Sequence, residues 1–429
     1  MKKTWLTLTF TAVLVFALSL LAGEVLLPWL NSRTYSQTAC LTDQITENMD
    51  IYDRAKLYRD NNSTVAVTVQ ARNTSDGYTY TSLGSGVCVA SNGYETKSLE
   101  NNIVASKGSY VVTNYHVIDM VYDSQYTNEK INLLTEEEIE YPCELLWSNA
   151  NLDVAVLYCE ENLDYVRMKD RIISPNANER LDYEPIFTIG TPLDLSYINR
   201  LTVGNVASNN LMTLPCAEYV YPSNSSTSVI GLYNAYEDVV DITVGITNGN
   251  SGGGCFDENG VLIGLTTLGL NVDSTGGNQM NGMVPIYPIL QVLDKLISNN
   301  EQNSSFTIHT NKSLGLKGFD MHEASSVIAF QQDSSYNYYY FDGQFYSVFS
   351  YSDTFSFSES GYYVLSNTST KFSSIKNGSI ITNCKINETN HEILDRNDFI
   401  YALLQIDAGD TVEITSSYLG VEYTQTVQF

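Results

Sequence analysis

The sequence lacks the common signatures of metal, nucleotide and redox sites. It has no CxxC pair, no HExxH motif, no histidine cluster and no Walker motif. These absences exclude the usual zinc sites, thioredoxin-like chemistry and a P-loop. Positive charge is also scarce, because 22 Lys and Arg stand against 49 Asp and Glu, for a formal net charge of −27. Such an anionic surface repels nucleic acid and anionic lipid headgroups. We therefore expect no cofactor, no metal and no nucleic-acid partner.

The composition is that of a globular protein rich in β-structure. Hydrophobic residues make up 43% of the chain and charged residues only 17%, which is not a disordered composition. The 31 Tyr residues, together with frequent Asn, Ser and Thr, favour strands and polar loops over helix bundles. A chain of 429 residues is too long for one ordinary core, so we expect two or three domains.

The N-terminus resembles a membrane anchor. Lys2 and Lys3 precede a mostly apolar run from Trp5 to Gly23, which as a helix would nearly span a bilayer core of about 30 Å with its positive end in the cytoplasm. A cleaved signal peptide is the alternative, but leucines occupy the upstream cleavage position, where a small residue is required. We favour an uncleaved single-pass anchor over residues 1–30 in the cell membrane. Under either reading the rest of the chain is extracytoplasmic, and cleavage would make it a secreted protein.

The seven cysteines leave at least one without an intramolecular partner. Cys143 and Cys159 are equidistant from Asn151, which lies in a predicted turn. Across a hairpin they could form a disulfide. They could equally remain as two buried free thiols, and the sequence leaves both alternatives open.

Short β-branched runs begin at Thr64 and are separated by Gly, Asn, Asp or Ser, a pattern that indicates a β-barrel or sandwich. A helix from Asp43 to Tyr58 is expected before them, and a helix from Ile289 to Ile297 after them. The remainder has its own strands and a helix from Asp398 to Ile406. The predicted organisation is an anchor over 1–30, a connector over 31–62, a β-rich domain over 63–298, a linker over 299–311 and a second domain over 312–429 that includes a Tyr-rich stretch, 326–360.

Peptide hydrolysis by a serine needs a base, a group that orients the base, and N–H donors aimed at the developing oxyanion. Of the four histidines, His116 alone lies in the first β-rich domain, directly after an apolar run. A lone histidine is more often structural than catalytic, so the assignment of a base depends on partners elsewhere in the domain.

Two such partners are present. Ser251 stands in TNGNSGGGC (247–255), where glycines allow the N–H groups of Gly249 and Ser251 to form an oxyanion hole. Asp153 begins the run DVAVL, where a buried acid can fix a histidine tautomer. A flexible glycine-rich turn and a hairpin-turn Asp are the alternatives. The chain order His116, Asp153, Ser251 is, however, that of chymotrypsin-type enzymes.

Six segments, in order, resemble the HtrA/DegP branch of the chymotrypsin-like serine proteases over roughly residues 62–298. They are GSGVCVASNGY (84–94), VVTNYHVI (111–118), NLDVAVL (151–157), TIGTPLDLSYINRLTVGNVAS (188–208), GNSGGGCFDENGVLIGL (249–265) and GMVPIYPILQVLDKL (282–296). The resemblance implies a mainly β, chymotrypsin-like double β-barrel with a triad of His116, Asp153 and Ser251 between the barrels. It also implies a serine endopeptidase that forms an acyl-enzyme with unfolded or exposed extracytoplasmic polypeptides, in quality control or processing, and a homotrimer.

The same resemblance places the P1 pocket. Gly245 and Ile246 begin its floor, and Thr266, Thr267 and Leu268 form a wall. No acidic residue stands at its base, so a basic P1 side chain would be buried without a partner. We predict a preference for a small or medium aliphatic P1 residue.

Two departures from the family pattern concern the nucleophile loop. Gly254 stands where the family usually has Pro, and we expect it to loosen the loop. Asn250 stands where digestive relatives carry Asp, so no carboxylate is available there to pair with a freed N-terminus. Activation by N-terminal cleavage is therefore not expected.

The C-terminal segments 313–320, 361–366, 375–387 and 397–429 resemble a PDZ domain of the kind that follows HtrA protease domains. The resemblance implies a loop that binds the carboxylate of a peptide C-terminus through backbone N–H groups, formed by Ser313, Leu314, Gly315 and Leu316. The groove beside the helix would add one peptide strand. The Tyr-rich stretch would be an insertion.

A catalytically silent chaperone or peptide-binding scaffold on the same fold is the alternative function. The presence of all three triad residues argues against it, although a disordered nucleophile loop would leave the protein silent. Labelling of Ser251 by a fluorophosphonate distinguishes the two functions.

Overall fold

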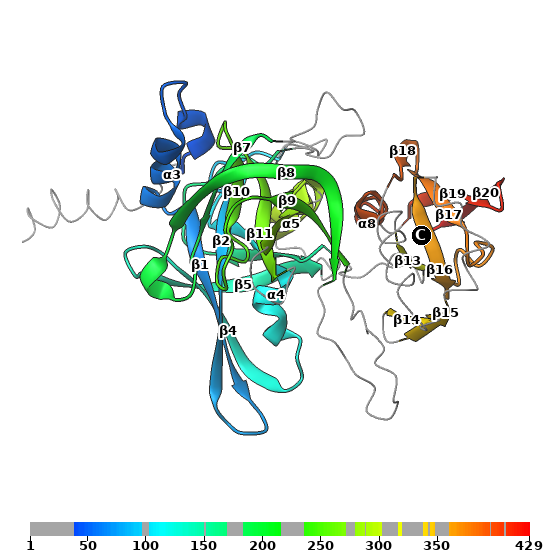
Figure 1. Ribbon diagram of the computed structural model, residues 1–429, viewed down its shortest axis with the longest axis horizontal. Helices are drawn as coiled ribbons and strands as arrows, with labels where there is room; N and C mark the ends of the chain where they lie inside the picture. The colour runs from blue at the N-terminus through cyan, green and yellow to red at the C-terminus, as the bar shows by residue number, and fades with distance from the viewer. Residues whose placement is uncertain are drawn as a thin grey trace, which may run out of the picture. The chain divides into compact units, whose positions relative to one another are not determined.

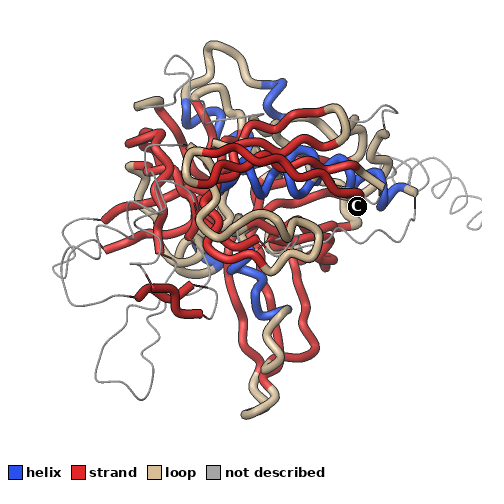
Figure 2. Tube along the Cα trace, turned by 90° about the vertical axis from the view of Figure 1, so that its right-hand side faces the viewer, coloured by secondary structure: helices blue, strands red, loops and turns tan. Residues whose placement is uncertain are grey.

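The computed structural model describes residues 38–96, 103–149, 152–169, 183–215, 236–271, 279–287, 289–302, 316–319, 338–341, 344–347, 360–394, 396–406 and 409–429. The predicted anchor over 1–30 lies outside these residues. Among the helices that are described, none is long and apolar enough to cross a membrane. Strands dominate the described chain, and few helices accompany them (Figure 2).

Six antiparallel strands close the first barrel in the order β1-β2-β3-β6-β5-β4 (Figure 1). They are β1 (Thr64–Asn73), β2 (Thr79–Ser91), β3 (Ser109–Thr113), β4 (Tyr126–Leu134), β5 (Glu140–Asn149) and β6 (Val154–Cys159). The core contains fully buried aliphatic side chains such as Val67, Val111, Leu133 and Leu157, as expected when β-branched runs alternate inward. Helix α4 (Tyr115–Ile118) and the 3-10 turn η3 (Asp119–Val121) follow β3.

The second barrel is also closed, in the order β10-β11-β12-β9-β8-β7. Its strands are β7 (Pro185–Gly190), β8 (Arg200–Pro215), β9 (Tyr236–Ile242), β10 (Gly254–Asp257), β11 (Leu262–Asn271) and β12 (Gln279–Pro285), with the 3-10 turn η5 (Leu195–Tyr197) after β7. The predicted mainly β fold with two six-stranded barrels is therefore confirmed. Helix α5 (Ile289–Glu301) begins at the predicted residue and extends beyond its predicted end.

The segment before the barrels packs against the second barrel. The 3-10 turn η2 (Leu41–Gln44) and helix α3 (Ile51–Asp60) replace the single helix predicted from Asp43 to Tyr58, which was wrong. Helix α3 starts late because the Asp50 side chain accepts hydrogen bonds from the first amides of the helix and caps it there. Tyr58 is fully buried and donates a hydrogen bond to the Gly260 carbonyl. Its ring centroid lies 5.0 Å from the ring centroid of Phe256.

The C-terminal part contains a separate sheet with the strand order β13-β16-β17-β19-β20, to which β18 adds through β17. The strands are β13 (Leu316–Phe319), β16 (Tyr362–Asn367), β17 (Ile380–Ile386), β18 (Thr389–Glu392), β19 (Thr411–Tyr418) and β20 (Val421–Gln428). Helix α8 spans Arg396–Leu404, slightly earlier than predicted. Phe399 and Leu403 of this helix lie in the core of the sheet.

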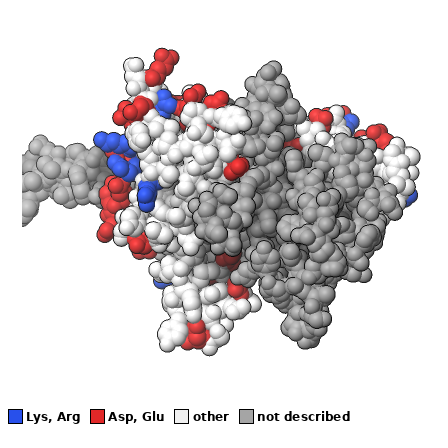
Figure 3. Space-filling view, in the orientation of Figure 1, with Lys and Arg blue, Asp and Glu red and all other residues white. Residues whose placement is uncertain are grey.

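Within the Tyr-rich stretch, β14 (Tyr338–Phe341) and β15 (Gln344–Ser347) form a two-stranded antiparallel sheet. No strand period was evident there in the sequence. On the face shown in Figure 3, acidic side chains are spread over the described surface and are not gathered into one patch.

Candidate active site

The predicted acid and base are in direct contact. Asp153 Oδ2 lies 2.9 Å from His116 Nδ1, and Asp153 Oδ1 lies 3.0 Å from the same nitrogen. The backbone N–H of His116 donates a further hydrogen bond of 3.0 Å to Asp153 Oδ1. Because an ionised carboxylate only accepts hydrogen bonds, Nδ1 carries the hydrogen of a neutral imidazole. The other ring nitrogen, Nε2, is then the one able to accept a proton.

Local structure fixes this pair. Asp153 immediately precedes β6 and has a left-handed φ of 48°, a conformation that is unfavourable for a residue with a Cβ. The Asn114 side chain holds it there by donating a 2.8 Å hydrogen bond to the Asp153 carbonyl. The Asp153 side chain is only 2% exposed, whereas the His116 side chain on α4 is 36% exposed. The acid is thus shielded from water while the imidazole can reach a substrate.

Ser251 lies in a loop that requires glycine on both sides. Gly249 has a φ of 93°, and a Cβ there would lie 2.3 Å from the Thr191 carbonyl oxygen. Gly252 has a φ of 81°, and a Cβ there would lie 2.2 Å from the Ser85 carbonyl oxygen. Any other residue at either position would combine backbone strain with a main-chain clash. The glycines therefore serve a tight turn and not a flexible one.

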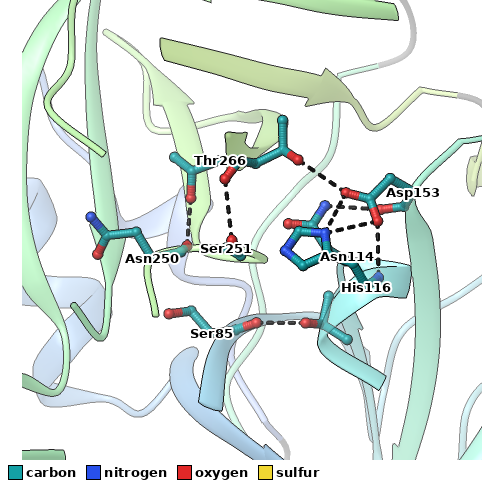
Figure 4. Close-up of polar contacts among 9 residues, drawn as sticks. Ser85, Asn114, His116, Asp153, Asn250, Ser251 and Thr266 are labelled. Carbon is teal, nitrogen blue, oxygen red and sulfur yellow. Dashed lines mark hydrogen bonds and ion pairs between the residues drawn. The ribbon is translucent and has the colours of Figure 1, made fainter. Parts of the chain in front are cut away.

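Thr267 links the nucleophile loop to the acid. Its carbonyl accepts a 3.1 Å hydrogen bond from Ser251 Oγ, and its hydroxyl donates a 3.0 Å hydrogen bond to Asp153 Oδ2. In Figure 4 the imidazole of His116 lies between Ser251 and Asp153. The structure therefore brings the three predicted triad residues into one site. The Ser251 hydroxyl in this state is bonded to Thr267 and must turn from it before it can meet His116.

Two backbone amides of the loop are available to an anion. The carbonyl of Asn248 accepts from the Leu193 amide at 2.7 Å, and the carbonyl of Asn250 accepts from the Gly253 amide at 2.8 Å. In a trans peptide the N–H points opposite to the carbonyl of the same peptide unit. The N–H groups of Gly249 and Ser251 therefore point away from the Leu193 and Gly253 amides that bind the preceding carbonyls. Within the described chain neither amide donates a hydrogen bond. Such a pair of donors can stabilise a developing oxyanion.

Ser85 holds the nucleophile loop to the first barrel, a role the sequence did not reveal. Its amide donates to the Ser251 carbonyl at 2.7 Å, and its hydroxyl donates to the Gly249 carbonyl at 2.8 Å. The same hydroxyl accepts from the Thr191 amide at 2.8 Å. The glycine before Ser85 is the sequence feature that could have indicated this contact. A Cβ at Gly84 would lie 2.5 Å from the Val117 side chain, so only glycine allows β2 to pack this close to α4.

The predicted pocket residues divide into two groups. A Cβ at Gly245 would have no heavy atom within 4 Å, so space is open beside it, whereas Ile246 is buried in the core of the second barrel. The Thr266 hydroxyl donates to the Asn250 carbonyl at 2.6 Å, and the Thr267 hydroxyl is bonded to Asp153. The Thr266 hydroxyl thus holds the loop at Asn250 and the Thr267 hydroxyl holds Asp153, while the Leu268 side chain lies outside the described residues.

Gly254 has a packing role instead of the predicted loosening one. It begins β10 and is paired with Leu265 and Ile189 on both sides. A Cβ at Gly254 would lie 2.4 Å from the Phe256 ring. That ring stacks on Phe187 with centroids 5.0 Å apart. The expectation of a looser loop was therefore wrong, because this glycine makes room for an aromatic ring inside a paired strand.

Loss of the Thr267 hydroxyl should slow the chemistry without weakening substrate binding. We expect Thr267→Val to lower kcat by about 10- to 100-fold with little change in KM, because a hydrogen bond to a buried carboxylate contributes about 1.5–3 kcal/mol. Thr267→Ser keeps the donor and should retain most of kcat. Steady-state kinetics on one peptide substrate measure both values, and a Val variant with the kcat of the wild type would show that the hydroxyl does not position Asp153.

Residues 84–265 match the family model of a trypsin-like peptidase domain. Its curated relatives include the serine protease Do-like HtrA of Lactococcus lactis subsp. cremoris (strain MG1363), which is 22% identical over 62% of this chain and 62% of its own length. A probable periplasmic serine endoprotease DegP-like of Marinomonas sp. (strain MWYL1) is 24% identical over 48% of this chain and 37% of its own length. The chain is thus related to the HtrA/DegP serine proteases and spans about 60% of the first of these relatives.

Among solved structures, the HtrA-type protease AlgW with decapeptide matches 87% of this chain and 96% of its own chain, with 17% identity and a TM-score of 0.47.

Proposed function

We propose that this protein is an HtrA-like serine endopeptidase that cleaves unfolded or exposed segments of extracytoplasmic proteins. One observation carries the proposal: the buried Asp153 orients His116 within a site where Ser251 stands beside two amides that donate no hydrogen bond to any described residue. Support also comes from relatives named as serine proteases and serine endoproteases.

The mechanism follows from these groups. Ser251 Oγ turns from the Thr267 carbonyl toward His116 Nε2 and attacks the scissile carbonyl carbon, while Nε2 takes the hydroxyl proton. Asp153, which faces Nδ1, stabilises the imidazolium that forms. The amides of Gly249 and Ser251 bind the oxyanion of the tetrahedral intermediate. His116 then gives its proton to the leaving amine, and water hydrolyses the acyl-enzyme by the same steps.

The specificity proposal is a small or medium aliphatic P1 residue. The pocket would lie over Gly245, where the backbone leaves open space, and the residues that the resemblance assigns to it include no carboxylate to pair with a basic side chain. We expect the protein to digest casein and to cleave a P1-varied peptide library after Ala or Val in preference to Arg or Lys. Preferred cleavage after Arg or Lys would contradict the specificity, and a complete lack of fluorophosphonate labelling would contradict the enzyme itself.

The remaining assignments are proposals for the parts outside the barrels. The segment over 1–30 would anchor the protein in the cell membrane, and the HtrA relationship supports a homotrimer.

The C-terminal domain would act as a PDZ-like module. In its described sheet, β13 has a partner strand on one side only, so a peptide could add along its other edge. Of the proposed carboxylate loop only Leu316 is described, buried at the start of β13, and Ser313, Leu314 and Gly315 lie outside the described residues.

A silent peptide-binding scaffold remains the second candidate because the Ser251 hydroxyl donates to Thr267 in this state. If that bond persisted, the hydroxyl would not reach the imidazole and a fluorophosphonate would not react. Labelling that appears only after an unfolded protein or a peptide is added would indicate that the site is an enzyme held at rest.

A further inference from the structure

Two cysteines face each other across the hairpin that carries the catalytic acid. Cys143 on β5 is directly paired in register with Cys159 on β6. Directly opposed residues of antiparallel strands have Cα atoms about 4.5–5.5 Å apart, which is within the range of about 4.4–6.8 Å that a disulfide requires. Both thiols are free in the structure, and the Cys143 thiol donates a 3.6 Å hydrogen bond to the Tyr141 carbonyl on its own strand.

The burial and the strand register of the two cysteines favour a disulfide between them over any other pairing. Cys159 is 2% exposed and belongs to the core of the first barrel, while Cys143 is half-buried at the edge of that core. Cys88 lies in the same core but is paired with Val111 and has no cysteine opposite it. Register therefore favours one pairing, and the exposure of Cys143 gives an oxidant access to it.

We propose that Cys143 and Cys159 are an oxidisable pair that forms a cross-strand disulfide once the chain is exported. The oxidant would be a disulfide-bearing compound, either an oxidised dithiol oxidoreductase or glutathione disulfide. The proposal rests on export of the chain and is independent of whether Ser251 is catalytic.

The chemistry is thiol–disulfide exchange. A thiolate of the pair attacks one sulfur of the oxidant's disulfide, forms a mixed disulfide and releases a thiolate. The second thiol then loses its proton and attacks the mixed disulfide, which closes the Cys143–Cys159 bond and expels the other thiolate of the oxidant. The protein loses two electrons and two protons, and the oxidant becomes a dithiol or two thiols. The neighbouring Cys143 thiol holds the pKa of Cys159 below its usual value, which favours the thiolate that this exchange needs.

The bond would stabilise the hairpin that presents the acid. Asp153 lies near the turn between β5 and β6, and the two cysteines lie at the opposite end of the same strand pair. A disulfide there closes a loop of about 15 residues and restricts the unfolded chain. We expect it to stabilise the first barrel and to change little in the geometry of the active site.

Mass spectrometry of the exported full-length chain tests the pairing. Free thiols are trapped in acid and alkylated under denaturing conditions, and the chain is digested with a protease that cuts after Glu144, which separates the two cysteines. We expect the Cys143 and Cys159 peptides to be joined, with a mass about two hydrogens below the sum of the two free peptides. Their cysteines should be alkylated only after reduction, whereas Cys88 and Cys255 should be alkylated without it. Labelling of Cys143 and Cys159 without reduction, or a link between Cys159 and Cys88, would overturn the proposal.

Thermal unfolding with and without a reductant gives a second, independent readout. Reduction should lower the Tm of the wild type by about 5–10 °C and leave the Tm of Cys143→Ser unchanged. Cys40→Ser, which alters a half-buried cysteine outside the barrel strands, should keep the sensitivity to reductant. A wild-type Tm that does not respond to reductant would contradict the pairing even if proteolysis by the protein were normal.

Discussion

Replacement of Ser251 by Ala is expected to lower kcat by about 10⁴- to 10⁶-fold and to abolish casein digestion above background. The alanine removes the hydroxyl oxygen that we propose as the nucleophile. The amides of Gly249 and Ser251 belong to the main chain and remain in place, so binding of a substrate carbonyl should persist. Single-turnover cleavage of a peptide, measured beside the wild type, gives the ratio.

Ser196→Ala is the matched control for this change. Ser196 is an exposed serine of η5 in the second barrel, and loss of its hydroxyl should leave kcat within about twofold of the wild type. Equal far-ultraviolet circular dichroism and Tm for the three proteins would exclude misfolding as the cause. Casein digestion by Ser251→Ala at the wild-type rate would show that the hydrolysis uses another nucleophile or a contaminant.

The sequence predicted the barrels and the three reacting groups because their signals are local. Runs such as TVAVTVQA carry the strand period within a few residues, and the glycines around Ser251 mark a turn that no other residue can adopt. The order of His116, Asp153 and Ser251 along the chain then restricts the topology. None of these inferences required knowledge of which distant residues meet.

The supporting hydroxyls could not be predicted because they act across the fold. Thr267 donates to an acid 114 positions away, and Ser85 donates to a carbonyl 164 positions away. Ser and Thr side chains are common in strands, so the sequence does not show which of them face a catalytic group. Gly254 was misinterpreted for a similar reason, since the ring of Phe256 that fills the space above it is invisible until the strand is paired.

Substitution of Asp153 by Asn is expected to lower kcat by about 10⁴-fold although it changes few atoms. The carboxylate accepts from the His116 amide, His116 Nδ1 and the Thr267 hydroxyl. An asparagine has one accepting oxygen, and its NH₂ group can only donate. If that NH₂ faces the imidazole, Nδ1 must become the acceptor and the hydrogen moves to Nε2. The ring then presents a donor to Ser251 and cannot take its proton.

Asp119→Asn separates this geometric effect from the simple loss of a negative charge near the imidazole. Asp119 is an exposed acid on η3 whose charge acts on His116, so its replacement should change kcat by less than about threefold. The rate of fluorophosphonate labelling of Ser251 should follow the same order, fast in the wild type and Asp119→Asn and very slow in Asp153→Asn. Similar losses in both variants would mean that Asp153 acts through its charge alone, and the tautomer argument for this site would fail.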